Sequence, residues 1–209
     1  MRFGKSQLAV CAAVLLAACG GSEKPAPEQP AANVVQPGAP GEPSRKVAPG
    51  TTTKVAPHSK ADVAFMQGML HHHQQAIVMT DWVPGRTANT SIRLLAQRMA
   101  VAQSAEMEQM RNWLTARDVD PADHSHGHEP MPGMLTTPQL DRLESAKGRE
   151  FDRLFLRYMT RHHQGALTMV AQLKERGGGN EAEIGVFTGH VNADQGIEIA
   201  RMRQLLAGL

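Results

Sequence analysis

Apolar residues recur with helical spacing along two long stretches of the chain, and turn-forming residues interrupt each stretch once. In the first stretch the pattern predicts a helix from about 59 to 83, with Ser59 as its N-cap and Pro84-Gly85 at its end. A second helix is predicted from about 89 or 90 to 116. Because the connection between them is short, these two helices should form an antiparallel hairpin.

The second stretch repeats this arrangement. A helix is predicted from about 149 to 176, where Gly177-Gly178-Gly179 stops it, and another from about 180 or 181 to 206. Between the two stretches lies a loop of residues 118–137, rich in proline and glycine, followed by a short helix that reaches about Lys147. Two alike hairpins predict an all-α fold, a four-helix bundle with a pseudo-two-fold axis.

The repeat is most specific in two histidine-rich segments. Residues 69–79 read MLHHHQQAIVM, and residues 159–169 read MTRHHQGALTM. The matching pairs are Met69 and Met159, His72 and His162, His73 and His163, Met79 and Met169, and, upstream, Asp62 and Asp152. The second helix of each hairpin matches at an offset of 92, where Gln103 and Glu106 correspond to Gln195 and Glu198.

A helical wheel separates the three histidines of the first segment. The apolar stripe of the predicted helix carries Asp62, His72 and His73, whereas His71 points outward. Two adjacent histidines differ in direction by about 100° on a helix. One histidine of each pair can therefore face the bundle interior while its neighbour lies at the edge.

The beginning of the chain is predicted to be a targeting signal. A basic start with Arg2 and Lys5 precedes a short apolar run that ends in Leu16-Ala17-Ala18-Cys19, which resembles a bacterial lipoprotein cleavage box. Residues 1–18 are then a signal peptide, and Cys19 is a lipid anchor. Gly20 after the cysteine favours sorting to the outer membrane of a Gram-negative cell.

Composition separates a tether from a folded domain. Residues 19–57 are rich in proline and alanine and lack apolar periodicity, so they are predicted to be a disordered linker, and residues 58–209 form the folded domain. The two cysteines, Cys11 and Cys19, both precede that domain, which excludes a disulfide or a cysteine-based zinc site within it. A formal net charge of +2 with no Lys/Arg cluster excludes a nucleic-acid partner.

Several motifs together resemble one known family. The segments MLHHHQQAIVM, MPGML and FDRLFLRYMTRHHQGALTM, with the repeated glutamine-glutamate helix, are similar to the "domain of unknown function 305" family over roughly residues 59–209. The resemblance implies a ferritin-like four-helix bundle in secreted or periplasmic bacterial proteins. It also implies a link to copper, because some members of that family are copper-binding proteins connected with copper tolerance.

The residues themselves point to copper independently. Thioether sulfur selects Cu(I), and imidazole nitrogen accepts either Cu(I) or Cu(II). Met-x-x-His places a sulfur and an imidazole one turn apart in both repeats. The predicted ligands on the helices are Met69, His72, His73, Met79, Met159, His162, His163 and Met169.

The loop between the hairpins carries a second candidate set. It contains His124, His126, His128, Met131 and Met134. Such a histidine-rich tract can also bind zinc or nickel, so its metal stays open. Four carboxylates, those of Asp62, Asp152, Glu106 and Glu198, are predicted to orient the histidines through hydrogen bonds, although the two aspartates also suit helix capping.

The same pattern disfavours an oxidase. Di-iron bundles use Glu-x-x-His, and no histidine of this chain has a glutamate three residues before it. The sequence therefore favours a non-enzymatic copper-binding protein, anchored on the periplasmic side of the cell envelope, that sequesters or buffers copper or exchanges it with a donor or acceptor protein. A metal-free structural or adaptor bundle at the membrane, a metal-dependent oxidase and a homodimer stay open.

Overall fold

The computed structural model describes residues 35–36, 45–46, 57–122 and 131–209, and the chain divides into a unit of residues 1–53 and a unit of residues 54–209. In the first unit, strands β1 (Val35–Gln36) and β2 (Arg45–Lys46) pair antiparallel, with Val35 opposite Lys46. A pair of two-residue strands leaves no periodic signal in a sequence, so it was not predicted. The predicted signal peptide and Cys19 lie outside the described residues.

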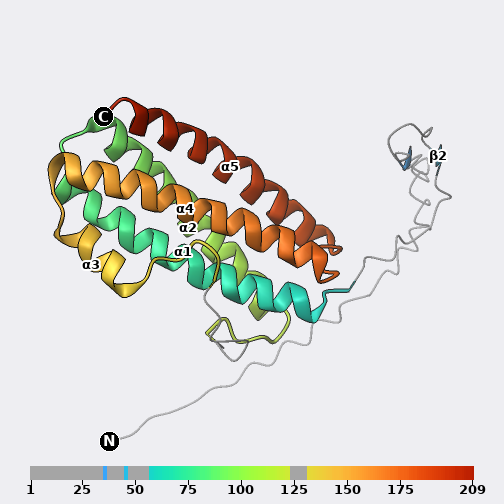
Figure 1. The fold of residues 1–209 in the computed structure, drawn as a ribbon. Coiled ribbons are helices and arrows are strands. Elements are labelled where there is room, and N and C mark those ends of the chain that lie inside the picture. Colours follow the sequence, from blue (N-terminus) through green and yellow to red (C-terminus); the bar gives the residue numbers. More distant parts are fainter. Residues whose placement is uncertain (1–34, 37–44, 47–56, 123–130) are drawn as a thin grey trace, which may run out of the picture. The chain divides into compact units, whose positions relative to one another are not determined.

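The second unit is a helical bundle (Figure 1). Its helices are α1 (Lys60–Arg86), α2 (Thr90–Thr115), α3 (Thr137–Ser145), α4 (Gly148–Glu175) and α5 (Ala182–Ala207). α1 pairs with α2 and α4 with α5, and the two hairpins meet where α1 packs against α4. The predicted all-α bundle is confirmed.

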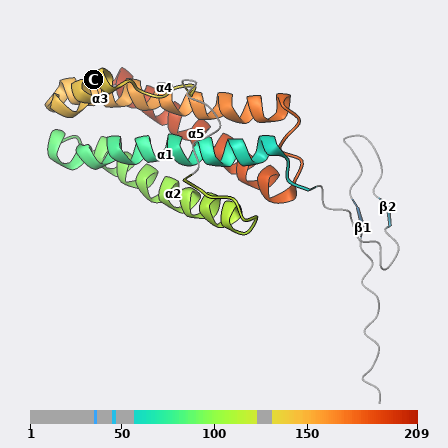
Figure 2. The same ribbon diagram turned by 90° about the horizontal axis from the view of Figure 1, so that it is seen from below.

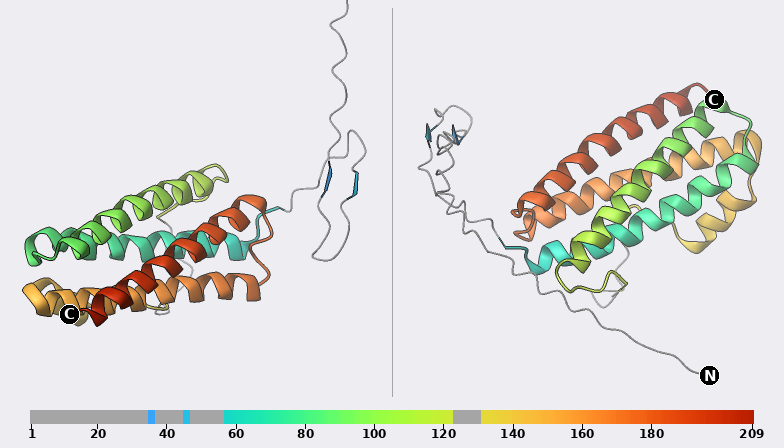
Figure 3. Two further views of the ribbon diagram at one scale, coloured as in Figure 1. Left: turned by 90° about the horizontal axis from the view of Figure 1, so that it is seen from above. Right: turned by 180° about the vertical axis from the view of Figure 1, so that it is seen from behind.

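The direction of the helices decides which side chains meet. α1 and α4 run in opposite directions, so the beginning of each lies beside the end of the other (Figure 2). Viewed from behind, α2 lies along α1 and α5 along α4 (Figure 3). Within the described part of the chain, no helix combines the length and the apolar character needed to cross a membrane.

The first helix begins as predicted but ends later. Ser59 caps α1, because its hydroxyl accepts the backbone N–H of Asp62 at 3.1 Å while the Asp62 carboxylate accepts the Ser59 N–H at 2.7 Å. The helix continues through Pro84 to Arg86. A proline in the last turn removes only one backbone donor, and the N–H of Thr87 closes that turn on the carbonyl of Val83 at 3.3 Å.

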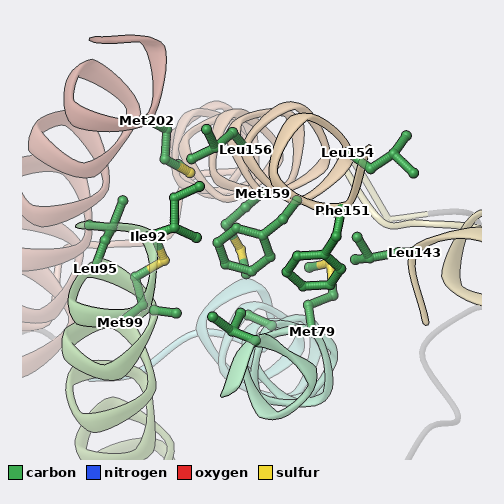
Figure 4. Packing of buried hydrophobic residues seen from close by; sticks show 14 of the residues in the cluster. Met79, Ile92, Leu95, Met99, Leu143, Phe151, Leu154, Leu156, Met159 and Met202 are labelled. Atoms are coloured by element: carbon green, nitrogen blue, oxygen red, sulfur yellow. The ribbon is translucent and has the colours of Figure 1, made fainter. Parts of the chain in front are cut away.

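The interior holds two hydrophobic clusters, one toward each end of the bundle. We call the first the α3 cluster, since Leu143 of α3 belongs to it. Figure 4 labels ten of its members, including Met79 of α1 and Met159 of α4. The second, the Trp113 cluster, is unusually rich in methionine. Its buried methionines are Met66, Met69, Met107, Met110 and Met169.

Two glutamines of α1 hold described residues of the connection between α2 and α3, Asp120 and Leu135. Gln67 donates from Nε2 to the carbonyl of Asp120 at 2.8 Å. Gln75 makes two hydrogen bonds with the backbone of Leu135, donating to its carbonyl at 3.0 Å and accepting its N–H at 2.7 Å. We call residues 131–136 the strap.

The strap also lies directly on α4, and two glycines allow this approach. Gly133 has a φ of +79° in the turn that the N–H of Met134 closes on the carbonyl of Met131 at 3.3 Å. A Cβ on Gly165 of α4 would overlap the carbonyl of Pro132. The strap therefore touches α1 through side chains and α4 through its backbone.

Candidate metal centre

A layer of polar side chains separates the two hydrophobic clusters at mid-length of the bundle. Each long helix supplies two residues to it: His72 and His73 from α1, Gln103 and Glu106 from α2, His162 and His163 from α4, and Gln195 and Glu198 from α5. The four histidines have no exposed surface, and the two glutamines are at most 3% exposed. The layer therefore places polar groups where a helical bundle normally has apolar ones.

One histidine of each hairpin is held by a glutamate of the same hairpin. Nε2 of His73 lies 2.6 Å from Oε2 of Glu106, and Nε2 of His163 lies 2.7 Å from Oε2 of Glu198. Because a carboxylate only accepts, Nε2 of each ring is the donor. The hydrogen bonds predicted for these two glutamates are therefore present, and Nδ1 of each ring has no partner within the described chain.

The other two histidines stack across the interface of the hairpins. The rings of His72 and His162 have centroids 3.7 Å apart and planes inclined by 33°. Nε2 of His72 lies 3.1 Å from the carbonyl oxygen of Pro132 in the strap. Since a carbonyl can only accept, the proton of His72 is on Nε2, and its Nδ1 carries a free lone pair.

His162 differs from His72 because neither of its ring nitrogens has a hydrogen-bond partner among the described residues. Burial, followed by the neighbouring histidines, lowers the pKa of His72 to about 3. Burial and the charge of His72 lower the pKa of His162 well below 6.5. Both rings are therefore neutral at physiological pH, which is the form of imidazole that binds metal ions.

The layer as a whole has an excess of unpaired polar atoms. Besides the four Nδ1 atoms, both amide atoms of Gln103 and Oε1 of Gln195 lack a partner in the described structure. Leaving a buried polar atom unpaired costs about 1–3 kcal/mol. A set of this size is explained most simply by a polar or ionic ligand, and nitrogen donors beside sulfur fit copper.

The methionines flank this layer on both sides. Met69 and Met169 belong to the Trp113 cluster, whereas Met79 and Met159 belong to the α3 cluster. This pairing follows from the antiparallel packing of α1 and α4, which brings the beginning of one methionine-histidine segment to the end of the other (Figure 2). Residues that are equivalent by sequence, such as Met69 and Met159, therefore lie on opposite sides of the layer.

The layer is not a preformed site for a single ion. Among the described residues, no three His, Cys, Asp or Glu side chains are grouped so that they could hold a metal ion together. An imidazole lone pair lies in the plane of its ring, and stacked rings such as those of His72 and His162 direct their lone pairs side by side rather than to one point. Joint coordination requires one ring to turn, and His162 is the ring without a hydrogen bond to break.

The two predicted aspartates have other positions. Asp62 belongs to the cap of α1 and accepts the backbone N–H of Gly179 at 2.7 Å. It lies ten residues before His72 on the same helix, a rise of about 15 Å, as Asp152 does before His162. The prediction that they orient the histidines is therefore wrong, because spacing along one face was mistaken for contact.

The loop set is only partly described. His124, His126 and His128 lie outside the described residues, whereas Met131 and Met134 are half-buried in the strap. Sequence reasoning missed Gln103 and Gln195 as members of the layer, although a polar residue at matching positions on two apolar faces was the available signal. It also missed the carbonyl of Pro132, which has no side-chain signal.

The profile of the domain of unknown function (DUF305) matches residues 62–206, which is most of the chain. The chain belongs to this family. Two solved family structures are similar to it. A DUF305 fragment from Deinococcus radiodurans has 28% identity and a TM-score of 0.66, and the match covers 74% of this chain and all of the fragment. A protein from Streptomyces coelicolor that is thought to be secreted has 29% identity and a TM-score of 0.61, and the match covers 71% of this chain and 93% of that protein.

A third similar protein, CopM, has been solved with bound metal. Its Cu(I)-bound form has 27% identity to this chain and a TM-score of 0.57, covering 70% of this chain and 96% of CopM, and it has also been solved with Cu(II) and with silver. A protein of Acanthamoeba polyphaga mimivirus, L153, is 34% identical over 56 residues. That match spans 27% of this chain and 37% of the viral protein.

Proposed function

We propose that this domain binds copper ions in the polar layer, through its buried histidines and the thioethers beside them. One observation carries the proposal: four fully buried histidines have unpartnered Nδ1 atoms in the described structure, and three of them donate Nε2–H to an oxygen. Metal-binding histidines characteristically donate their second nitrogen in this way, which fixes the tautomer and the ring. CopM, with its bound copper, supports the choice of metal.

The ligands that we assign are His72 and His162 at the centre, with His73 and His163 beside them. Sulfur is available from Met69 and Met169 on one side of the layer and from Met79 and Met159 on the other. Neutral imidazole and thioether suit Cu(I) in particular, because both are uncharged donors and the site is shielded from water. Glu106 and Glu198 then act by holding the rings of His73 and His163.

We further propose that the protein sequesters or buffers copper, or exchanges it with another protein, on the periplasmic side of the cell envelope, where Cys19 would anchor it. The similarity to a Streptomyces coelicolor protein that is thought to be secreted supports an extracytoplasmic location. A binding role is favoured over an enzymatic one, because no Glu-x-x-His motif of a di-iron oxidase is present in the sequence.

Competition for Cu(I) tests the proposal. The full chain is titrated anaerobically against a Cu(I)-chelating dye, and a variant with both His72→Leu and His162→Leu is compared with wild type. We expect the double variant to lose at least about a hundredfold in affinity, because it lacks the central nitrogen donors. His190→Leu, which replaces an exposed histidine of α5, is the matched control and should bind as wild type.

A subtler variant covers the case in which the double variant does not fold. Glu106→Gln keeps the shape of the side chain but weakens the support of His73, and it should lose about tenfold to a hundredfold in affinity. Cu(I) affinities of both variants equal to that of the His190→Leu control would contradict the proposal.

A metal-free structural bundle is the second candidate. It is favoured by the finding that, in the described ranges, no three His, Cys, Asp or Glu side chains form a ready metal site. Thermal unfolding separates the two functions, since a ligand that binds only the folded state must raise the melting temperature. A melting temperature that does not change with Cu(I) would favour the structural bundle.

A further inference from the structure

The seam between the strap, α1 and α4 brings together two methionines that are 38 residues apart in sequence, Met131 and Met169. Both reach the same point on α1, at Gly68. A Cβ built on Gly68 would lie 3.4 Å from Cε of Met169 and 3.6 Å from Sδ of Met131. Because Gly68 has no side chain, both methionine side chains lie against the same part of the α1 backbone.

This meeting point adjoins the histidine layer. Gly68 precedes His72 by four residues, which is about one helical turn on the same face. Pro132, which follows Met131, accepts the hydrogen bond of His72 at 3.1 Å. The thioether pair and the central histidine are therefore connected through both the helix and the strap.

The exposed fraction of the side chains decreases from the methionine pair to the central histidines. Met131 is half-buried, Met169 is 8% exposed, and His72 and His162 have no exposed surface. Met131 packs against the Trp113 cluster, which contains Met169 and Met69. The series runs from a half-buried methionine, through a nearly buried methionine, to the fully buried histidines.

The position of Met131 is fixed rather than incidental. The strap is tied to α1 by the two hydrogen bonds between Gln75 and Leu135. Its backbone is seated on α4, where Gly133 and Gly165 permit contact that a side chain would prevent. Both attachments fix the backbone of the strap that carries Met131.

We propose that Met131 and Met169 form an outer site for a soft monovalent ion, Cu(I) or its analogue Ag(I), at which the ion is taken up before it moves to His72 and His162. The proposal rests on the proposed copper-binding function and adds a route to it. Two thioethers bind Cu(I) weakly enough to release it, and their softness excludes hard cations such as calcium and magnesium. The order of exposure makes the methionine pair the entry point, and a higher affinity of the histidines for the ion would draw it inward.

Methyl NMR of the full chain, labelled with ¹³C at the methionine Cε atoms, tests the outer site directly. Ag(I) is added in substoichiometric steps. We expect the signals of Met131 and Met169 to shift together, while that of Met99, which is fully buried in the α3 cluster, stays in place. Unchanged Met131 and Met169 signals, with Ag(I) bound elsewhere, would overturn the proposal.

A variant without the central ring separates this proposal from the copper function. In His162→Leu, the Met131 and Met169 signals should still shift with Ag(I), because the outer site does not need the imidazole. If they shift although Cu(I) affinity equals that of wild type, the histidine site fails and the outer site stands. If affinity falls but the two methionine signals never move, the outer site fails and the histidine site stands.

Loading kinetics provide a second measurement. Transfer of Cu(I) from a chelating dye is followed by stopped-flow absorbance in Met131→Leu and in the control Met99→Leu. Leucine keeps the apolar volume but removes the sulfur, so we expect the loading rate of Met131→Leu to fall at least about tenfold relative to the control. Equal rates in the two variants would contradict the proposal.

Discussion

The two hairpins carry the same polar residues at matching positions, yet the strap contacts them differently. At one pair of equivalent positions, α1 has Gln75 and α4 has Gly165. Gln75 ties the strap down by two hydrogen bonds to Leu135, whereas Gly165 leaves room for the backbone of Pro132 to lie on α4. The first hairpin therefore binds the strap through the side chain of Gln75. The second hairpin makes room for the strap because Gly165 has no side chain.

The same difference reaches the histidines. His72 donates to the strap through Nε2, while its counterpart His162 has no hydrogen bond at either nitrogen in the described structure. The sequence repeat supplies symmetric donors, and the strap makes the two halves unequal. A ring held by a hydrogen bond to the strap therefore faces a ring that packing alone holds in place.

The largest expected effect is a loss of stability in acid. The folded-state pKa of His72, about 3, lies below the unfolded value of 6.5, and that of His162 is also lowered. The unfolded chain therefore binds more protons below pH 6.5, and the metal-free protein loses stability as the pH falls from 6.5 toward 3. Each histidine contributes a slope of about 1.4 kcal/mol per pH unit.

Urea unfolding between pH 6 and pH 4, in the presence of a metal chelator, measures this slope. The single variants His72→Phe and His162→Phe each remove one of the two groups, so each should have a slope smaller by about 1.4 kcal/mol per pH unit. A variant with the slope of wild type would show that the replaced ring is not buried in its neutral form.

The next largest loss of stability is expected where the backbone of the strap packs against Gly165 of α4. In Gly165→Ala, the new methyl group overlaps the carbonyl of Pro132, and backbone atoms can move only together with the whole strap. We expect destabilisation of about 2–3 kcal/mol, measured by thermal or urea unfolding.

The same substitution elsewhere provides the control. Gly189 lies on α5, and a Cβ there meets nothing within 4 Å. Gly189→Ala should therefore stabilise the protein by about 0.5–1 kcal/mol, because alanine favours the helix. Two identical substitutions with the same sign would mean that the strap does not rest on α4 as described.

The helices and the candidate layer could largely be predicted from the sequence, for a physical reason. Periodicity, caps and turn residues are local, so the bounds of α2, α4 and α5 agree with the predictions to within two residues. The repeat identified the four histidines and Glu106 and Glu198 because polar residues on an apolar face are costly and stand out.

Contacts across the pseudo-symmetry axis could not be predicted in the same way. A repeat shows which residues are equivalent, whereas packing decides which residues meet, so Met69 was associated with His72 but not with Met169. The carbonyl of Pro132 and the space above Gly68 depend on the path of the strap, for which no side-chain pattern exists. Of the two roles predicted for Asp62, the structure shows the helix cap and not the orientation of a histidine.

The next largest effect on stability is expected from replacing one of the two aspartates. Asp62 accepts the N–H of Ser59 at 2.7 Å and that of Gly179 at 2.7 Å, which ties the beginning of α1 to the end of α4. In contrast, Oδ1 of its counterpart Asp152 has no partner in the described structure. Asp62→Ala should lose about 1–2 kcal/mol of unfolding free energy and Asp152→Ala clearly less, measured in the same urea titration. Equal losses would show that the two hairpin ends are alike.

The smallest effect is expected where the strap is tied to α1. Gln75→Ala removes two hydrogen bonds to Leu135, but water can replace them because Gln75 is only half-buried. We expect a loss of about 1 kcal/mol, while Gln74→Ala, at the exposed neighbouring position, should have almost no effect. Hydrogen exchange at the Leu135 amide, whose N–H loses its acceptor, should accelerate only in Gln75→Ala. If that amide exchanged at the wild-type rate, the seat on α4 alone would hold the strap, and the difference between the two hairpins would lie in Gly165 rather than in Gln75.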